Sequence, residues 1–223
     1  MTSAQVRERI LETGIIPVVR AYSAKDAMFA VKAVAAGGIP IAELTMTVPG
    51  AIEVIADLVK TMGTDVIVGA GTVLDAETAQ RCIDAGAEFI VSPGFDLETV
   101  KLCKQQSMLV MAGALTPTEI ITAWKAGSDF VKIFPCGNVG GAKYIKALKG
   151  PLPQVPMIPT GGVNLETAAD FIRAGAAALG IGGELISPAA LKTGDSLEIT
   201  RIARRYLTAI AQARSPSSIA VPN

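Results

Sequence analysis

The sequence AGSDFVKIFP, residues 126–135, contains the end of a helix, a turn and a strand. The chain repeats this helix–turn–strand junction, which we call a joint. Ala126-Gly127 ends a helical pattern, and a glycine in that place is the left-handed cap that turns a helix back toward a sheet. The apolar run 130–134 then predicts a buried β-strand, which Pro135 stops because proline cannot donate to a strand ladder. A helix, a tight turn and a buried strand in this order form the unit of a parallel α/β sheet.

The same joint recurs along the chain. Ala36-Gly37, Ala85-Gly86 and Ala174-Gly175 each end a helical pattern a few residues before the next apolar run. Four such joints favour repeated strand–helix units over an all-helical or all-strand fold. Candidate helix N-caps are Asp75, Asp96, Thr116 and Asn164, and Pro49 and Pro117 are candidate first-turn prolines.

Eight strands and their intervening helices are predicted. The strands cover residues 15–20, 41–46, 66–71, 89–93, 109–112, 130–134, 157–160 and 178–181. Helical patterns cover 24–36, 49–62, 76–85, 97–105, 117–126, 142–148, 165–174 and 197–213. Eight strands without a GxGxxG turn favour a single α/β domain, a (β/α)₈ TIM barrel, over an open doubly wound sheet, which stays an alternative.

The ends of the chain complete this domain assignment. A helix before residue 15 is expected to close the bottom of the barrel. Residues 1–213 are assigned to one barrel domain, and the Ser/Pro-rich segment 214–223 is expected to be a flexible C-terminal tail.

Composition narrows the class of protein. Of the 223 residues, 20 are basic and 20 are acidic, so nothing indicates a nucleic-acid or membrane partner. The sequence contains no histidine, which a zinc hydrolase, a metal-dependent aldolase or a Ser-His-Asp hydrolase would normally need. No metal or organic cofactor is implied. Three cysteines outside any metal spacing and the absence of a signal-peptide pattern predict a cytoplasmic protein.

The strand ends carry the chemistry-bearing residues, as expected for a barrel whose reactive groups lie at the carboxyl ends of its strands. Lys132 and Glu43 each sit in a strand of small or apolar residues, so both side chains are expected to face the barrel interior. Burial disfavours the ammonium form of a lysine, and a neutral amine attacks carbonyl carbon. The two residues therefore form either a structural ion pair or a catalytic amine and base.

Two glycine pairs follow the last two strands. Gly161-Gly162 comes after the seventh strand and Gly182-Gly183 after the eighth, where barrels commonly bind phosphate. Glycine lets backbone N–H groups approach an anion closely, although ordinary turn glycines are the alternative.

Seven segments in this order resemble the 2-keto-3-deoxy-6-phosphogluconate (KDPG) / 4-hydroxy-2-oxoglutarate (KHG) aldolase family. They are AELT (42–45), GAGTV (69–73), VSPG (91–94), LTPTE (115–119), VKIFP (131–135), KGP (149–151) and PTGGV (159–163). The resemblance covers roughly residues 10–210. It implies a class I aldolase on a (β/α)₈ barrel, which in this family is usually a homotrimer.

The resemblance also assigns roles to individual residues. It implies that Lys132 is the Schiff-base lysine, that Glu43 is the acid–base group, and that Thr72 binds the carboxylate of the 2-keto acid. It further implies that Thr160 contributes to stereocontrol and that the phosphate-binding backbone is formed by Gly161, Gly162, Gly182 and Gly183.

The chain departs from the family pattern at two positions. Many members carry a carboxylate-binding arginine where this chain has Thr47. Arg20 resembles the arginine that another branch of the family carries at the end of the first strand, and we expect it to bind the substrate anion. Many members have a serine where this chain has Gly183. The missing hydroxyl leaves the preference for a phosphorylated substrate open.

The reaction implied by the resemblance is reversible cleavage of KDPG to pyruvate and glyceraldehyde 3-phosphate. Cleavage of KHG to pyruvate and glyoxylate is a second candidate reaction. The alternatives are a phosphate-binding barrel isomerase or epimerase without imine chemistry, and a catalytically silent barrel.

Overall fold

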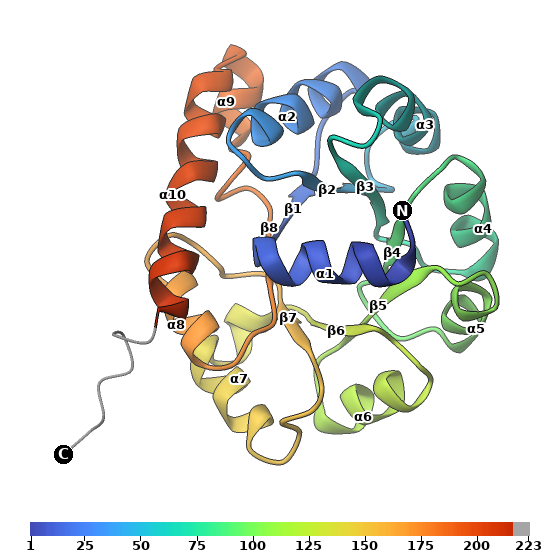
Figure 1. The fold of residues 1–223 in the computed structure, drawn as a ribbon, viewed down its shortest axis with the longest axis vertical. Coiled ribbons are helices and arrows are strands. Elements are labelled where there is room, and N and C mark those ends of the chain that lie inside the picture. The colour runs from blue at the N-terminus through green and yellow to red at the C-terminus, as the bar shows by residue number, and fades with distance from the viewer. Residues whose placement is uncertain (216–223) are drawn as a thin grey trace.

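The computed structural model describes residues 1–215 and shows eight parallel strands closed into a barrel with helices outside (Figure 1). The strands are β1 (Ile15–Val19), β2 (Ile41–Thr45), β3 (Ile67–Gly71), β4 (Phe89–Val91), β5 (Leu109–Ala114), β6 (Phe130–Ile133), β7 (Met157–Pro159) and β8 (Leu179–Ile181). Their order in the sheet is β7-β6-β5-β4-β3-β2-β1-β8, and a single parallel bridge between Thr160 and Gly180 joins the two outer strands. The predicted (β/α)₈ barrel is confirmed.

Helices cover the outside of the barrel. They are α2 (Ala24–Ala36), α3 (Ala51–Met62), α4 (Ala76–Asp84), α5 (Leu97–Gln105), α6 (Pro117–Lys125), α7 (Ala142–Lys149), α8 (Ala168–Arg173) and α10 (Ser196–Arg214). Two further elements were not predicted, the 3₁₀ turn η1 (Cys136–Val139) and the short helix α9 (Pro188–Thr193). Of the predicted tail, Arg214 belongs to α10, and residues 216–223 lie outside the described residues.

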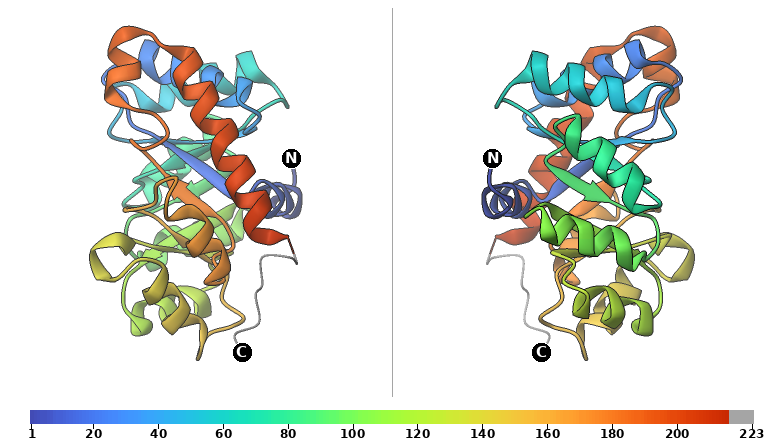
Figure 2. Two further views of the ribbon diagram at one scale, coloured as in Figure 1. Left: turned by 90° about the vertical axis from the view of Figure 1, so that its left-hand side faces the viewer. Right: turned by 90° about the vertical axis from the view of Figure 1, so that its right-hand side faces the viewer.

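Helix α1 (Ser3–Thr13) lies across one end of the barrel (Figures 1 and 2). Its Val6 and Ile10 pack with apolar side chains from inside the barrel, such as Ile16 and Ile41. Because these partners lie at or near the starts of their strands, α1 covers the amino-terminal end. The carboxyl ends of the strands, where barrel enzymes carry their chemistry, lie at the other end.

The helix ends largely follow the predicted signals. Gly86, Gly127 and Gly175 adopt the left-handed conformation with φ of 95°, 99° and 97°, as predicted. At the first joint the left-handed residue is Gly38, with φ of 96°, and Gly37 keeps a right-handed helical conformation. The prediction for Gly37 was therefore displaced by one residue, because a second glycine follows it.

The predicted N-caps were right for three helices, since Asp75, Asp96 and Thr116 each accept the backbone N–H three residues on. Asn164 was wrong as the cap of α8, because its side chain accepts the N–H groups of Glu166 and Thr167 at 3.0 Å and closes a separate turn first.

Pro49 was wrong as a first-turn proline. Helix α3 begins at Ala51, and its N-cap Gly50 has a left-handed φ of 67°. A left-handed residue cannot continue a right-handed helix, so Gly50 separates Pro49 from the first turn. Pro117, by contrast, occupies the first turn of α6.

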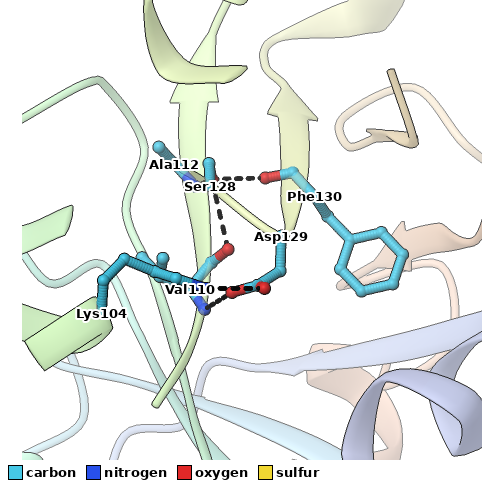
Figure 3. A network of polar contacts seen from close by, with 6 residues as sticks. All are labelled: Lys104, Val110, Ala112, Ser128, Asp129 and Phe130. Carbon is cyan, nitrogen blue, oxygen red and sulfur yellow. Dashed lines mark hydrogen bonds and ion pairs between the residues drawn. The ribbon is translucent and has the colours of Figure 1, made fainter. Parts of the chain in front are cut away.

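Two polar residues fix the start of β6 against β5 (Figure 3). The Ser128 hydroxyl accepts the N–H of Ala112 at 2.9 Å and donates to the carbonyl of Phe130 at 2.6 Å. The Asp129 carboxylate accepts the N–H of Val110 at 2.9 Å. These bonds satisfy backbone groups where the strands begin and hold the register that sets Lys132 near the carboxyl end of β6.

Within residues 1–215, every helix is too short or too polar to cross a lipid bilayer.

Candidate active site

Lys132 and Glu43 meet inside the barrel. The Lys132 Nζ lies 3.4 Å from the Glu43 Oε1, and the two side chains are only 5% and 3% exposed. Strands β6 and β2 are four places apart in a closed sheet of eight, so the two side chains approach each other across the interior. The expectation that both face inward is therefore confirmed.

The distance between Lys132 and Glu43 helps to decide between a structural and a chemical role for the pair. A charge-assisted N–H···O bond is usually about 2.7–2.9 Å long, so the contact at 3.4 Å is loose. A buried ion pair contributes little net stability because desolvating both charges offsets their attraction. A purely structural role would be served as well by two apolar side chains, which favours the chemical interpretation of the pair.

The position of Glu43 depends on a glycine in the next strand. A Cβ atom on Gly71 would lie 2.1 Å from the Glu43 Oε1 and 2.5 Å from its Cγ. Thr72 follows Gly71 directly and has a φ of 58°, a left-handed conformation that is uncommon for a residue with a side chain. Such local strain persists where the surrounding structure holds it, often at ligand sites.

Six of the predicted substrate-binding residues lie around one cavity of about 120 Å³. They are Arg20, Thr160, Gly161, Gly162, Gly182 and Gly183. We call this space the glycine-lined cavity. Thr72 does not line it, so its contact with a substrate carboxylate stays a prediction.

Phe134 links the glycine-lined cavity to the lysine. Its side chain lines the cavity, and the Lys132 Nζ lies 5.6 Å from the centre of its ring. An ammonium or iminium group at this distance from an aromatic face is stabilised by the ring quadrupole. Sequence reasoning gave Phe134 no role, because a phenylalanine in an apolar strand has no local signal that separates it from core.

The loop after β7 needs its glycines. Gly161 and Gly162 have φ of 85° and 76°, which glycine adopts without steric cost. A Cβ atom on Gly162 would lie 2.7 Å from the Cα of Gly137 in the loop after β6. The N–H of Gly137 also donates to the carbonyl of Gly161 at 2.9 Å. The two loops are therefore packed backbone to backbone, which fixes the rim of the cavity.

The loop after β8 is built differently. Gly182 and Gly183 lie outside the left-handed region, and a Cβ atom on Gly183 would meet nothing within 4 Å. The fold itself would accept a side chain at Gly183. The absence of a side chain at Gly183 leaves this part of the cavity wall open.

Arg20 is exposed at the end of β1, and within residues 1–215 its guanidinium has no acidic partner. It is therefore available for an anionic ligand. Thr47, which stands where many family members carry an arginine, shares a hydrogen bond of 2.7 Å with the Thr45 hydroxyl. Thr45 in turn donates to the carbonyl of Val19. This chain of hydroxyls joins the ends of β1 and β2.

Burial keeps the thiol of the cysteine next to the site protonated. Cys136 is fully buried after Pro135, and burial raises the pKa of its thiol to about 11. The thiol is therefore protonated at neutral pH, and it is the thiolate that reacts.

Helix α9 is the element that sequence reasoning missed near the site. Its six residues are too few for a helical period to be recognised. The available signal was Ser187-Pro188, because serine is a good N-cap and proline suits the first helical position. The Ser187 hydroxyl indeed accepts the N–H of Ala190 at 3.0 Å.

Comparison with known proteins gives a consistent result. Residues 6–202 match the sequence model of the KDPG and KHG aldolase family. A 2-dehydro-3-deoxy-phosphogluconate aldolase of Treponema pallidum is 35% identical over 90% of this chain and 95% of its own length. A KHG/KDPG aldolase of Escherichia coli K12 is 35% identical over 88% of this chain and 92% of its own length.

A solved structure is also similar. It is a KDPG aldolase from Legionella pneumophila with pyruvate captured at low pH as a covalent carbinolamine intermediate. Its TM-score is 0.83 at 29% identity, and the match covers 89% of this chain and 96% of that one.

Proposed function

Because this chain belongs to the KDPG and KHG aldolase family, we propose that Lys132 and Glu43 carry out the aldol cleavage of its substrate. The protein is a class I aldolase, a lyase that cleaves KDPG to pyruvate and glyceraldehyde 3-phosphate. The observation that carries the residue assignment is the buried contact of the two side chains, with the Phe134 ring both 5.6 Å from the Lys132 Nζ and in the wall of the glycine-lined cavity.

Lys132 supplies the electron sink. Its neutral amine attacks the C2 carbonyl of the substrate, and loss of water from the resulting carbinolamine gives an iminium ion. Cleavage of the C3–C4 bond sends its electron pair into the iminium and produces an enamine of pyruvate. The Phe134 ring near the nitrogen stabilises the positive charge of the iminium.

Glu43 moves the protons. It removes the proton of the C4 hydroxyl, directly or through a water, as the C3–C4 bond breaks and the aldehyde forms. It then returns a proton to C3 of the enamine, and hydrolysis of the iminium releases pyruvate and the free lysine. General acid–base catalysis of this kind contributes about 10²–10⁴-fold.

The remaining residues hold the substrate. Arg20 and Thr72 bind the carboxylate of the 2-keto acid, and the Thr160 hydroxyl directs the C4 oxygen and with it the stereochemistry. Backbone N–H groups of the loops after β7 and β8, at Gly161-Gly162 and Gly182-Gly183, bind the phosphate. KHG, which carries a carboxylate in place of the phosphate-bearing end, is the second substrate.

Trapping of the imine tests this proposal. Incubation with pyruvate and borohydride should add one reduced pyruvate to the wild-type protein, as measured by intact mass. Lys132→Ala should remove the adduct, whereas Lys143→Ala, which changes an exposed lysine on α7, should retain it. An unmodified wild type, or an adduct that persists in Lys132→Ala, would refute the assignment.

The quaternary state belongs to the same proposal. We propose a homotrimer, in keeping with the family resemblance. Support comes from exposed apolar side chains in successive strand–helix units, namely Leu74, Leu97, Ile121 and Val139. Large apolar side chains left exposed in this way can be covered where copies of the chain meet. Light scattering after size-exclusion chromatography should give three times the chain mass, and a monomer mass would contradict it.

We also propose a cytoplasmic location. The thiols of Cys82, Cys103 and Cys136 are all free and buried, which suits a reducing compartment. Fractionation of the source cells with an antibody to this chain should find it with cytoplasmic markers, and recovery with the envelope would contradict the proposal.

A further inference from the structure

A second cavity of about 400 Å³ adjoins the glycine-lined cavity. The two share Val18, Arg20 and Gly183 in their walls. One side of the second cavity is formed by Ala21 and Tyr22, which connect β1 to α2. Its wall also contains Ile186, Pro188 and Leu191, in and before α9, a helix that lies beside α2 (Figure 1). We call this space the α9 cavity.

The walls of the α9 cavity are mainly hydrocarbon. The polar side-chain groups that line it are the guanidinium of Arg20, at the junction with the glycine-lined cavity, and the hydroxyls of Thr47 and Tyr22. The Thr47 hydroxyl is already bonded to Thr45. Among residues 1–215, no carboxylate lines the cavity, and Ile186 and Leu191 present buried aliphatic side chains. Away from the Arg20 guanidinium, such a wall favours an apolar group over a polyhydroxylated one, because buried hydroxyls would find few hydrogen-bond partners there.

The sizes of the two cavities indicate how a ligand would use them. The glycine-lined cavity, at about 120 Å³, has less than a third of the volume of the α9 cavity, at about 400 Å³. A longer or bulkier substituent must therefore continue beyond it. Gly183 stands at the junction with open space around its Cα, so the passage is free.

We propose that the enzyme, in the direction of synthesis, also accepts unphosphorylated aldehydes with an apolar alkyl or aryl substituent, and that the α9 cavity holds this substituent. This inference rests on the proposed aldolase function. The enamine carbon of pyruvate on Lys132 bonds to the aldehyde carbon, and the aldehyde oxygen takes its proton from Glu43. One water hydrolyses the iminium, which releases a 4-hydroxy-2-oxo acid that bears the apolar group at C4.

Rates with a pair of unphosphorylated aldehydes test the proposal. Pyruvate is supplied with 3-methylbutanal or with glyceraldehyde, and the 4-hydroxy-2-oxo acid is quantified by mass spectrometry. The apolar aldehyde should have the higher kcat/KM, by about tenfold or more, since a methylene in an apolar pocket is worth about 10–200-fold in discrimination. An equal or lower kcat/KM than that of glyceraldehyde would overturn the proposal.

Two matched variants locate the effect. Tyr22→Glu places a carboxylate in the wall of the α9 cavity, and Leu197→Glu places one at a distant residue of almost equal exposure, 78% against 79%. Tyr22→Glu should lower kcat/KM for 3-methylbutanal by about tenfold or more and change that for glyceraldehyde much less. Leu197→Glu should change neither. Equal effects of the two variants would contradict the assignment of the cavity.

Borohydride trapping in the same samples separates this inference from the one on which it rests. If the pyruvate adduct forms on Lys132 but the apolar aldehyde is not preferred, the α9 cavity proposal alone fails. If no adduct forms in the wild type, the aldolase assignment fails and this inference fails with it.

Discussion

A Cβ atom on Gly71 would lie 2.1 Å from the Oε1 of Glu43, so the glycine at the end of β3 leaves the space that the carboxylate of β2 occupies. Gly71→Ala must therefore displace Glu43. A misplacement of about 1 Å can cost about 10²-fold in rate, and we expect kcat to fall by that order. The pyruvate adduct should still form, because Lys132 is unchanged.

Gly94→Ala is the matched control for this prediction. Gly94 also follows a strand of the barrel, but a Cβ atom there would meet nothing within 4 Å. Its kcat should stay close to that of the wild type in the same steady-state assay. A full rate in Gly71→Ala would show that the place of Glu43 is not critical.

The buried pair itself can be tested for stability apart from activity. Lys132→Met leaves the Glu43 carboxylate buried without its partner, and we expect the free energy of unfolding to fall by about 3–5 kcal/mol. The double variant Lys132→Met/Glu43→Leu removes both charges and should recover most of this loss, although it must be inactive. Urea unfolding of the four proteins of this cycle measures the coupling. A double variant that is no more stable than Lys132→Met would indicate that the pair holds the fold together.

Thr160 should govern the configuration of the product. Thr160→Val keeps the shape of the side chain and removes its hydroxyl, which lies beside Gly180 in the closing bridge of the barrel. We expect imine formation to continue while the ratio of the two C4 epimers falls several-fold toward unity. Chromatographic separation of the epimers formed from pyruvate and glyceraldehyde measures this ratio. An unchanged ratio would remove Thr160 from stereocontrol.

The three buried thiols should make the fold sensitive to alkali. Burial raises the pKa values of Cys82 and Cys136 to about 11 and that of Cys103 to about 12, from an ordinary value of 9.0. A raised pKa in the folded state gives stability that is complete below pH 9 and is lost as the pH rises toward 11, because the unfolded chain ionises first. The free energy of unfolding should therefore decrease between pH 8.5 and 10.5.

Replacement of all three cysteines by alanine controls for other titrating groups. The variant starts from a lower stability, but its free energy of unfolding should fall less steeply over the same pH range. Parallel slopes for the two proteins in guanidinium titrations would mean that the thiols do not cause the loss.

Short sequence patterns, such as helix caps and apolar runs, predicted most of the fold. Helices α2 and α5 were predicted with their observed bounds, and each begins at a side-chain N-cap, Ser23 or Asp96. All eight strands were found from their apolar runs. Pro49 and Asn164 were assigned wrongly because a neighbouring residue, Gly50 or Thr167, holds the helix boundary instead.

The site was predictable where a residue is unusual for its strand. A lysine and a glutamate inside apolar strands stand out in the sequence, and Lys132 and Glu43 do meet. The need for Gly71 depends on a contact between strands, and no local pattern contains that information. The same applies to the α9 cavity, whose walls come from residues more than 150 positions apart, such as Tyr22 and Leu191.

The bridge between Thr160 and Gly180 closes the barrel where its two outer strands meet. Strand β8 pairs with β1 through three successive residues, whereas within residues 1–215 its ladder pairing with the other edge is the bridge to Thr160, supported by the hydrogen bond of 2.9 Å from the Ala177 N–H to the Met157 carbonyl. A substrate held by Thr160 and by the glycine loops on both sides would clamp the two edges of the sheet together. Binding of the substrate would then also stabilise the closed barrel. Amide hydrogens of β7 and β8 should therefore exchange more slowly when pyruvate is bound.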